Sequence, residues 1–400
     1  MEHTLQPPAR TSLSLLTFTG LCVLVGLNLR PSLAVIGPLT EHLQLALAMN
    51  YTQISLLTLL PVLVMGLGCF VAMPLARRLG VHQLVGIALV LIALADLMRL
   101  FDLGWLAFLS TALLGGAGIA LVQALMPAII KRQTGERMAI TMGWYITAIM
   151  CGAALSSTLA PILTDTLDSW RHSMASWGLL AAVAALFWQG NRRGLALPAE
   201  HRSHSPQPTL VPGRSAALAV FFALAGTGYV CVLAWLPPYT MDLGFSAVES
   251  GYLLGYLTCV EVVAGLLFPS LAQRSTDRRP VIFLVLGLTM VGFLVLALMP
   301  QTPSILVPLT LLGLGIGGQF PLAMIVAMDH HPDHQVAGQI VGRVQGYGYT
   351  LAAFTPLLAG VTRDLLGTFV DVWLVLAAAY VLLFLLAAEF NPRHYHRQFR

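Results

Sequence analysis

The sequence contains little charge. Only 10% of its 400 residues are Asp, Glu, Lys or Arg, whereas about 25% is usual in soluble globular proteins. Hydrophobic residues make up 57% of the chain, and the mean hydropathy is +0.81. A soluble protein this apolar would expose large hydrophobic patches and aggregate. The composition therefore excludes an ordinary soluble protein and favours a lipid bilayer as the solvent.

Lysine is almost absent, since Lys131 is the only one among 21 basic residues. The arginines gather at the ends of apolar segments and not along one face, so the net charge of +4 does not indicate a nucleic-acid partner. The five cysteines are odd in number and scattered singly, which excludes a disulfide framework and the spacing of metal ligands. We therefore expect no metal, no cofactor, and cysteines that pack as small apolar side chains.

Catalytic clusters are missing from the apolar segments as well. A membrane-embedded enzyme would need paired Asp residues, a His-x-x-x-His pair or a Ser/His set at one depth, and the apolar segments contain none of these. The stretch 329–334 (DHHPDH) resembles a metal cluster. Because Pro332 breaks the helix there, the histidines need not share a face, and we expect a solvated turn. The sequence thus argues against an enzyme.

Long apolar runs fill the rest of the chain. A membrane-spanning helix needs about 20 apolar residues, and these runs are too long for barrel strands and lack their two-residue alternation. The first run has no small-x-small cleavage site, so we interpret it as an uncleaved span. The sequence predicts an all-α integral membrane protein with twelve transmembrane helices, at 12–39, 52–76, 83–101, 104–130, 138–163, 172–189, 215–240, 246–273, 280–299, 304–328, 337–362 and 369–389.

The basic residues predict the orientation of these helices. If both termini lie in the cytoplasm, 17 of the 21 basic residues fall on the cytoplasmic side, as the positive-inside rule requires. Arg99, Arg171 and Arg363 fall on the outer side, and Arg30 lies within a span. We therefore expect a multi-pass protein of the bacterial inner membrane with cytoplasmic termini.

A polar stretch at 190–213, rich in Pro, Ser, His and Arg, predicts a cytoplasmic linker between a six-helix bundle at 1–189 and another at 214–400. The halves look related, because Pro127 and Pro321 lie 194 residues apart and other matches share nearly the same offset. Two related halves with a site between them at the membrane midplane are a recurring transporter plan.

Glycine-rich strings lie at matching places in the two halves, LGGAGI at 114–119 and LGLGIG at 312–317. Their Gly-x-Gly spacing follows no predicted strand, so it does not indicate a dinucleotide-binding loop. Close packing and flexing of helices are the expected roles.

Several strings resemble a known family. The turn at 73–82 (MPLARRLGVH) is similar to the Gly-x-Leu-Ala-Asp-Arg-x-Gly-Arg-Arg motif of the major facilitator superfamily, although Arg77 replaces its Asp and leaves the usual charge relay without its acid. Other strings resemble the cyanate transporter branch of that superfamily and, more distantly, 2-nitroimidazole transporters: GLNLRP at 26–31, LLGGAGI at 113–119, QALMP at 123–127, IKR at 130–132 and AWLP at 234–237. The resemblance implies two six-helix bundles that rock about a central site for a small solute.

Arg30 is the most informative single residue. An arginine within a span is costly in lipid and usually faces a cavity or a partner, and its planar guanidinium suits a small oxyanion or a planar anion. The alternative is that its side chain reaches toward the outer membrane surface. Pro31 can kink the helix. Asn28 lies about 200° around the helix from Arg30, so we expect it to bond a neighbouring helix.

Glu261 is the second charge expected deep in the membrane, near the middle of the eighth span. A low-dielectric environment disfavours its charged form. It is a candidate for pairing with Arg30 in the empty site or for carrying a coupled proton. A protonated, hydrogen-bonded structural role is the equal alternative.

Six further residues complete the candidate substrate site, and each is costly to bury without a partner. For each, bonding between helices is the competing role, and for Trp235 so is anchoring at the membrane interface. They are Gln123, Tyr145, Tyr229, Trp235, Gln319 and Gln345.

These features lead to one function with open alternatives. We expect a monomeric secondary transporter of a small, cyanate-like anion that works by alternating access, with the bilayer and the solute as its partners. The alternatives are a carrier for a neutral or weakly acidic compound such as a 2-nitroimidazole, in either direction, and a channel. Moving a negative charge inward costs about 2.3 kcal/mol per 100 mV of membrane potential. A cotransported proton would neutralise that charge, which is the physical reason to consider proton coupling.

Overall fold

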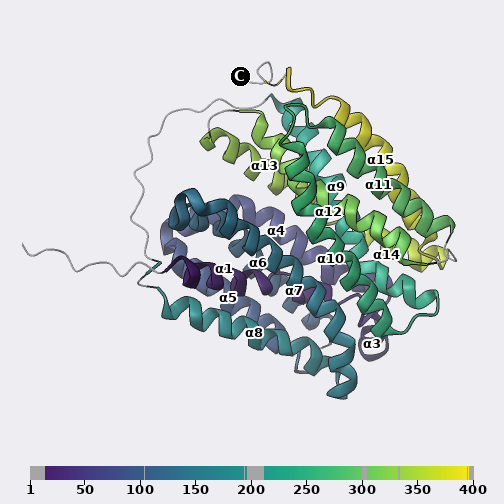
Figure 1. The fold of residues 1–400 in the computed structure, drawn as a ribbon. Helices are drawn as coiled ribbons and strands as arrows, with labels where there is room; N and C mark the ends of the chain where they lie inside the picture. The colour runs from purple at the N-terminus through teal and green to yellow at the C-terminus, as the bar shows by residue number, and fades with distance from the viewer. Residues whose placement is uncertain are drawn as a thin grey trace, which may run out of the picture.

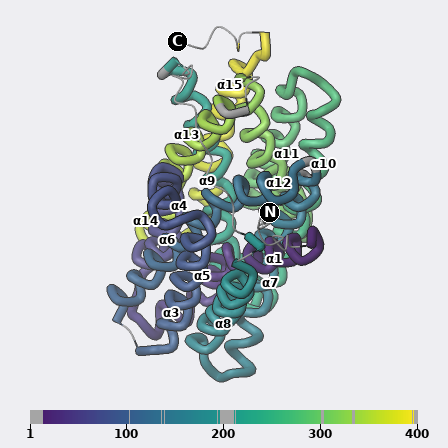
Figure 2. The backbone as a smooth tube through the Cα atoms, turned by 90° about the vertical axis from the view of Figure 1, so that its left-hand side faces the viewer, coloured from purple at the N-terminus to yellow at the C-terminus, as the bar shows by residue number. Residues whose placement is uncertain are grey.

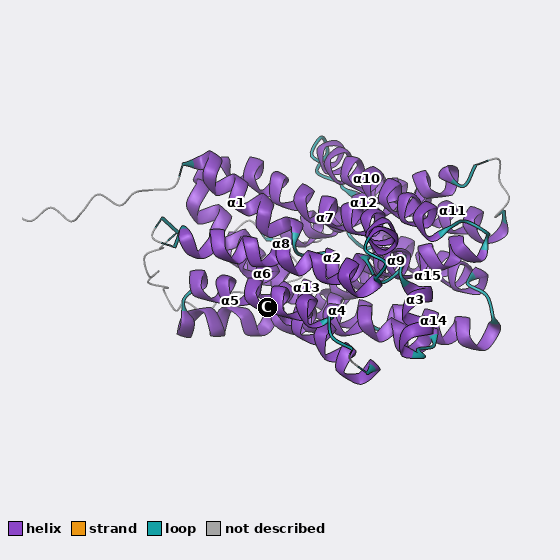
Figure 3. Ribbon diagram, turned by 90° about the horizontal axis from the view of Figure 1, so that it is seen from below, coloured by secondary structure: helices purple, strands orange, loops and turns teal. Residues whose placement is uncertain are grey.

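The computed structural model describes residues 14–102, 104–192, 194–195, 211–299, 304–331, 334–393 and 395, and every regular element among them is a helix (Figure 3). The first half contains α1 (Leu15–Leu27), α2 (Pro31–Ala34), α3 (Thr40–Leu47), α4 (Tyr51–Leu79), α5 (Val81–Met98), α6 (Trp105–Thr134), the short 3-10 helix η1 (Gly135–Arg137), α7 (Met138–Thr166) and α8 (Trp170–Gly190). The second half contains α9 (Pro212–Asp242), α10 (Ala247–Ala272), α11 (Arg279–Leu298), α12 (Leu306–Asp329), α13 (His334–Ala352), α14 (Thr355–Leu366) and α15 (Val370–Ala388). The all-α prediction is confirmed, while most of the predicted linker at 190–213 lies outside the described residues.

The first predicted span is broken in its middle, whereas the sequence predicts one continuous helix. Because Pro31 has no N–H and its ring clashes with the carbonyl four residues earlier, the helix stops before it. The prediction for Asn28 is wrong: its side chain donates to the carbonyl oxygen of Leu24 at 2.7 Å and so closes the end of its own helix, α1. Arg30 therefore precedes α2 and does not lie inside a helix.

The predicted span at 337–362 is also interrupted. It consists of α13 and α14, which are separated at Ala353 and Phe354, and Pro356 lies in the first turn of α14. Eleven stretches of the described chain are long and apolar enough to cross a membrane, and α1 with α2 forms one of them. The α13–α14 pair corresponds to the remaining predicted span.

The helices form two bundles. In the first, α4 packs against α6, α5 against α6 and α8, and α1 against α7; in the second, α10 packs against α12, α11 against α12 and α15, and α9 against α13. The bundles touch through α7 with α10, α4 with α13 and α14, and α2 with α9. They converge near α3 and diverge toward the start of α1 (Figure 1), and the purple-to-blue first half lies below the green-to-yellow second half in Figure 2. We call these two ends of the molecule the α3 end and the termini end.

Both glycine-rich strings lie inside helices, in α6 and α12, and both allow close helix packing. A Cβ atom on Gly116 would overlap Pro61 of α4, and one on Gly317 would overlap the backbone of Glu261 in α10. The prediction of close packing is thus confirmed, and the position of α10 next to α12 fixes where Glu261 lies.

Candidate functional site

Arg30 lies where the two bundles meet. Its side chain is only 6% exposed, so it does not reach toward the membrane surface. One terminal nitrogen donates to the Met65 sulfur of α4 at 3.8 Å, and the guanidinium carbon lies 5.5 Å from the ring centre of Tyr229 in α9. The Nε–H has no hydrogen-bond partner. The break between α1 and α2 thus places the Arg30 guanidinium, with one unpaired N–H donor, at the boundary between the two bundles.

Three tyrosines surround this guanidinium. Tyr145 of α7, Tyr229 of α9 and Tyr349 of α13 all interact electrostatically with Arg30. Tyr349 also interacts with Gln123 of α6. Both bundles therefore contribute to one polar cluster, which we call the Arg30 cluster: Arg30, Gln123, Tyr145, Tyr229, Glu261 and Tyr349.

Glu261 of α10 belongs to this cluster. Its side chain is 4% exposed and interacts electrostatically with Arg30 and Tyr229. Within the described residues, the carboxylate forms no ion pair with Arg30, and neither of its oxygens has a hydrogen-bond partner. The two ionisable side chains therefore share a site without direct contact.

Buried polar atoms without partners are concentrated in the Arg30 cluster. They include the Arg30 Nε, the Gln123 Oε1, the hydroxyls of Tyr145 and Tyr229, and both Glu261 oxygens. Leaving a buried polar group unpaired costs about 1–3 kcal/mol. Polar side chains whose only role is to hold helices together would form hydrogen bonds with one another. These donors and acceptors, by contrast, are not bonded to any of the described side chains.

Tyr349 is not among the residues that the sequence analysis predicts for the site, although its spacing from a predicted residue indicates it. It lies four residues after Gln345, which places both on one face of α13. Gln345 itself is half-buried on that helix and is not among the electrostatic partners of Arg30.

The structure places two other candidates away from the Arg30 cluster. The Gln319 amide donates to Thr289 at 2.5 Å and accepts from the Tyr380 hydroxyl at 3.0 Å, so it ties α12 to α11 and α15. Trp235 is fully buried at the α3 end, where its indole N–H donates to the Pro356 carbonyl at 3.0 Å. Both side chains thus bond partners within the protein, and Trp235 is buried and not exposed at the surface.

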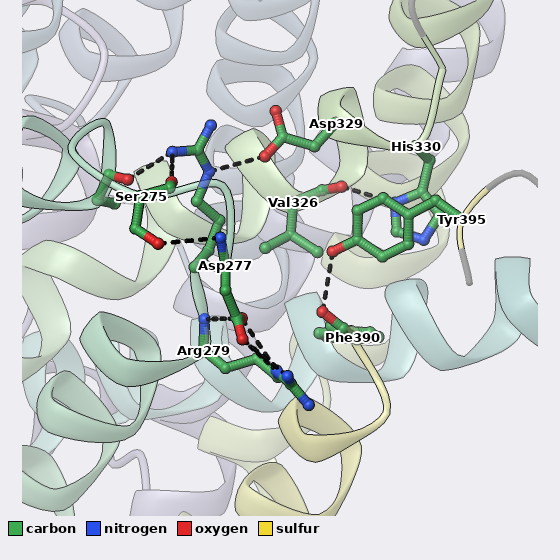
Figure 4. Close-up of polar contacts among 10 residues, drawn as sticks. Ser275, Asp277, Arg279, Val326, Asp329, His330, Phe390 and Tyr395 are labelled. Atoms are coloured by element: carbon green, nitrogen blue, oxygen red, sulfur yellow. Dashed lines mark hydrogen bonds and ion pairs between the residues drawn. The ribbon is translucent and has the colours of Figure 1, made fainter. Parts of the chain in front are cut away.

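A second polar cluster lies at the termini end (Figure 4). His330, which follows α12, is buried, accepts from the Arg214 Nε–H at 2.9 Å, and stacks on Tyr395 with ring centres 3.9 Å apart. Desolvation by burial lowers the pKa of His330 to about 4, so its ring is neutral near pH 7. Burial also raises the pKa of Tyr395 to about 12, which keeps its hydroxyl protonated and donating to the carbonyl of Phe390.

These contacts bear on the stretch 329–334, which resembles a metal cluster in the sequence. Asp329 accepts from the Arg278 Nε–H at 2.8 Å, and the His330 Nδ1 bonds the carbonyl of Val326 at 2.6 Å. Nearby, hydrogen bonds from Arg279 lower the pKa of Asp277. Pro332 and Asp333 lie outside the described residues, and the part of the chain that is described contains no group of three metal-ligating side chains.

Comparison with known proteins agrees with this architecture. The family model described as Major Facilitator Superfamily matches residues 16–360. The chain is 36% identical to the cyanate transport protein of Escherichia coli (strain K12), over 92% of this chain and 96% of that protein. It is 28% identical to the 2-nitroimidazole transporter of the same organism, over 92% and 93%.

Solved structures share the fold at much lower sequence identity. The inward-open xylose transporter of E. coli superposes with a TM-score of 0.75 at 14% identity, over 95% of this chain and 97% of that one. A proton-coupled xylose symporter superposes with a TM-score of 0.74 at 15% identity, over 94% and 98%. The chain is therefore a membrane transporter and not an enzyme, and it belongs to the major facilitator superfamily.

Proposed function

We propose that this transporter carries a small monovalent anion of the cyanate type and that Arg30 binds it. The observation that carries the proposal is the buried guanidinium at the boundary between the bundles, with a donor that has no partner. The terminal oxygen or nitrogen of a linear anion such as cyanate can accept a charge-assisted hydrogen bond from such a donor. The 36% identity to a cyanate transport protein supports the same substrate class.

The tyrosines complete the site for an acceptor-rich solute. The hydroxyls of Tyr145 and Tyr229 are unpaired donors beside Arg30. They come from different bundles, so a solute that bonds both of them links the halves. In alternating access, two halves rock about such a central site, and the solute's own bonds stabilise the state in which the site is enclosed.

Glu261 is the proposed proton-carrying group. Inward movement of an anion opposes the membrane potential by about 2.3 kcal/mol per 100 mV, and a proton that moves with it removes that cost. Glu261 has no hydrogen-bond donor in this conformation and interacts with Arg30, whose charge the anion would neutralise. Binding of the anion would therefore favour protonation of Glu261.

The orientation and the assembly follow from the sequence. We place the termini end in the cytoplasm of a bacterial cell, because the order of the spans in the sequence assigns 17 of the 21 basic residues to the cytoplasmic side. With this orientation, the helices of the two bundles diverge toward the cytoplasmic side (Figure 1). Each chain contributes residues from both of its halves to the Arg30 cluster, which supports a monomer as the working unit.

A second candidate substrate is a 2-nitroimidazole. Three tyrosine rings around the guanidinium suit a flat heteroaromatic ring, and the nitro group offers two acceptor oxygens for Arg30. The 28% identity to a 2-nitroimidazole transporter supports this candidate.

Uptake into proteoliposomes separates the two candidates. We expect Arg30→Gln to raise the KM for cyanate on the order of 100-fold, because a buried charged partner is removed, and Arg30→Lys to raise it about tenfold, because the ammonium lacks the planar fork. Arg77→Gln, which removes an exposed arginine at the termini end, is the matched control and should leave KM unchanged. Wild-type cyanate kinetics in both Arg30 variants would contradict the anion site, and saturable 2-nitroimidazole uptake without cyanate uptake would favour the second candidate.

A further inference from the structure

A buried ion pair holds the short helix that follows Arg30. The Ser32 hydroxyl of α2 donates to both carboxylate oxygens of Asp96 in α5, each at 2.8 Å. An Arg99 terminal nitrogen lies 3.2 Å from the Asp96 carboxylate and 3.4 Å from the Ser32 carbonyl oxygen, to which it donates. The Arg99 Nε–H donates to the Thr111 hydroxyl of α6 at 3.1 Å. The Asp96–Arg99 pair thus forms hydrogen bonds with both the side chain and the backbone carbonyl of Ser32.

Asp96 and Arg99 lie three residues apart and form a local ion pair, but its surroundings differ from those of a surface pair. Asp96, Arg99 and Thr111 are each at most 1% exposed. A buried ion pair is weak evidence for stability, because desolvation offsets much of the attraction. Apolar side chains could fill the same space at comparable stability, so the pair calls for a role beyond packing.

The position of Ser32 suggests that role. It lies two residues after Arg30, and only Pro31 separates them. The backbone at 28–30 is outside any helix, so helical hydrogen bonds do not fix the direction in which Arg30 leaves the chain. The carbonyl of Arg30 accepts from the backbone N–H groups of Leu33 and Ala34 at 3.0 and 2.9 Å, which couples its orientation to that of α2.

We propose that Ser32, Asp96 and Arg99 are positioning residues for substrate binding: by fixing α2 against α5 and α6, they aim the Arg30 guanidinium into the Arg30 cluster. This inference rests on the proposed role of Arg30 in binding the anion. It assigns a function to a broken helix, because an unbroken helix would have fixed Arg30 through its own hydrogen bonds.

Ser32→Ala is the informative substitution, since it removes the bond to Asp96 and leaves the Asp96–Arg99 ion pair intact. Ser173→Ala is the matched control. The Ser173 hydroxyl of α8 donates to the carbonyl of Ala160 in α7 at 2.7 Å and is fully buried in the same bundle. Both variants therefore lose one buried hydrogen bond between helices, and only Ser32→Ala loses it beside Arg30.

Cyanate uptake kinetics and thermal unfolding of the purified full-length chain test the proposal. We expect Ser32→Ala to raise the KM for cyanate about tenfold, as misplacement of a binding group does, with the maximal rate nearly unchanged. Ser173→Ala should keep the wild-type KM within about twofold. Ser32→Ala should unfold at the lower temperature of the two, because the Ser32 hydroxyl bonds a charged carboxylate and the Ser173 hydroxyl bonds a neutral carbonyl. An equal KM in the two variants would overturn the positioning role.

A double-mutant cycle separates this role from the role of Arg30 itself. In an Arg30→Lys background, Ser32→Ala should add no further rise in KM, because the flexible ammonium does not depend on the direction of α2. Additive effects would contradict positioning. A wild-type KM in both Arg30→Lys and Arg30→Gln would instead refute the anion site. A raised KM in those two variants together with a wild-type KM in Ser32→Ala would refute only the positioning role.

Discussion

The carboxylate of Asp364 in α14 accepts a hydrogen bond from the backbone N–H of Thr52 at 2.8 Å, and so joins the second bundle to the first turn of α4. It also accepts from the Thr52 hydroxyl at 2.5 Å and from the N–H of Tyr51 at 3.2 Å. The first N–H groups of a helix have no partner within the helix and attract anions. The neighbouring Arg363 pairs with Asp242 at 2.9 Å and lies over the Tyr51 ring. Asp364 thus closes the α3 end by capping a helix of the opposite bundle.

Asp364→Ala should loosen this end of the transporter. We expect the population with the α3 end open to rise at least about fivefold, because all three hydrogen bonds are lost and a single one is worth about 1 kcal/mol net of hydration. Spin labels at Glu41 and Leu243 in a cysteine-free background, measured by double electron–electron resonance, report the separation of the bundles there. Asp371→Ala removes an acid from the first turn of α15 and serves as the control. Equal distance distributions in the two variants would show that the Asp364 contact does not hold the end closed.

The residues of the Arg30 cluster show how far the sequence could predict the site. Arg30 and Glu261 were identifiable because a charge in an apolar run is costly, and Tyr145, Tyr229 and Gln123 were identifiable as polar residues in spans. Hydropathy could not show which polar side chains would find partners in the protein. Gln319 and Gln123 are both glutamines in apolar spans, but Gln319 bonds Thr289 and Tyr380 whereas the Gln123 Oε1 has no partner.

The broken helices mark the limit of the fold prediction. Apolar runs locate spans well, since spanning length is set by the bilayer. They do not reveal where the hydrogen bonds of a span stop, and Pro31 and Pro356 each lie in the first turn of a helix that follows a break. Other prolines, such as Pro61 and Pro127, remain inside continuous helices. The sequence alone therefore does not distinguish the prolines that follow a break from those that remain inside a helix.

Glu261→Gln should abolish proton-driven accumulation and preserve binding. Glutamine is close in size and polar but cannot exchange a proton, so cyanate–cyanate counterflow should continue while accumulation driven by a pH gradient falls at least about tenfold, in the range of proton-transfer roles. Glu249→Gln is the control, because Glu249 is on the same helix and forms the capping box with Ser246. Full gradient-driven accumulation by Glu261→Gln would remove this residue from the coupling step.

His330 makes stability depend on pH at the termini end. Its pKa falls from 6.5 to about 4 on burial, so the unfolded chain binds a proton in this window and the folded chain does not. Stability is therefore fully present above pH 6.5 and is lost as the pH falls toward 4, by on the order of 3 kcal/mol at most.

His330→Gln should flatten that dependence, because glutamine can still accept from Arg214 but does not titrate. The measurement is the unfolding temperature in detergent, followed by tryptophan fluorescence from pH 7.5 to pH 4.5. His172→Gln, an exposed histidine at the start of α8, is the control and should retain the wild-type slope. Identical slopes in all three proteins would contradict the buried neutral form of His330.

Gly66 controls the distance between the bundles along α4 and α13. A Cβ atom on Gly66 would lie 2.6 Å from the backbone nitrogen of Thr350 and 2.8 Å from the carbonyl oxygen of Gly346, closer than packed atoms approach. Gly66→Ala should therefore push α4 away from α13, lower the unfolding temperature and slow cyanate transport. Destabilisation of about 1–3 kcal/mol is usual for overpacking.

Gly143→Ala provides the matched comparison for this close approach. Gly143 is inside α7, and no atom lies within 4 Å of the position that its Cβ would take. Alanine is favoured over glycine in a helix by up to about 1 kcal/mol, so Gly143→Ala should unfold at the wild-type temperature or slightly above it. Because the two substitutions add the same methyl group, any difference between them measures the contact between α4 and α13. Equal unfolding temperatures and transport rates would mean that the bundles are not held this close in the membrane.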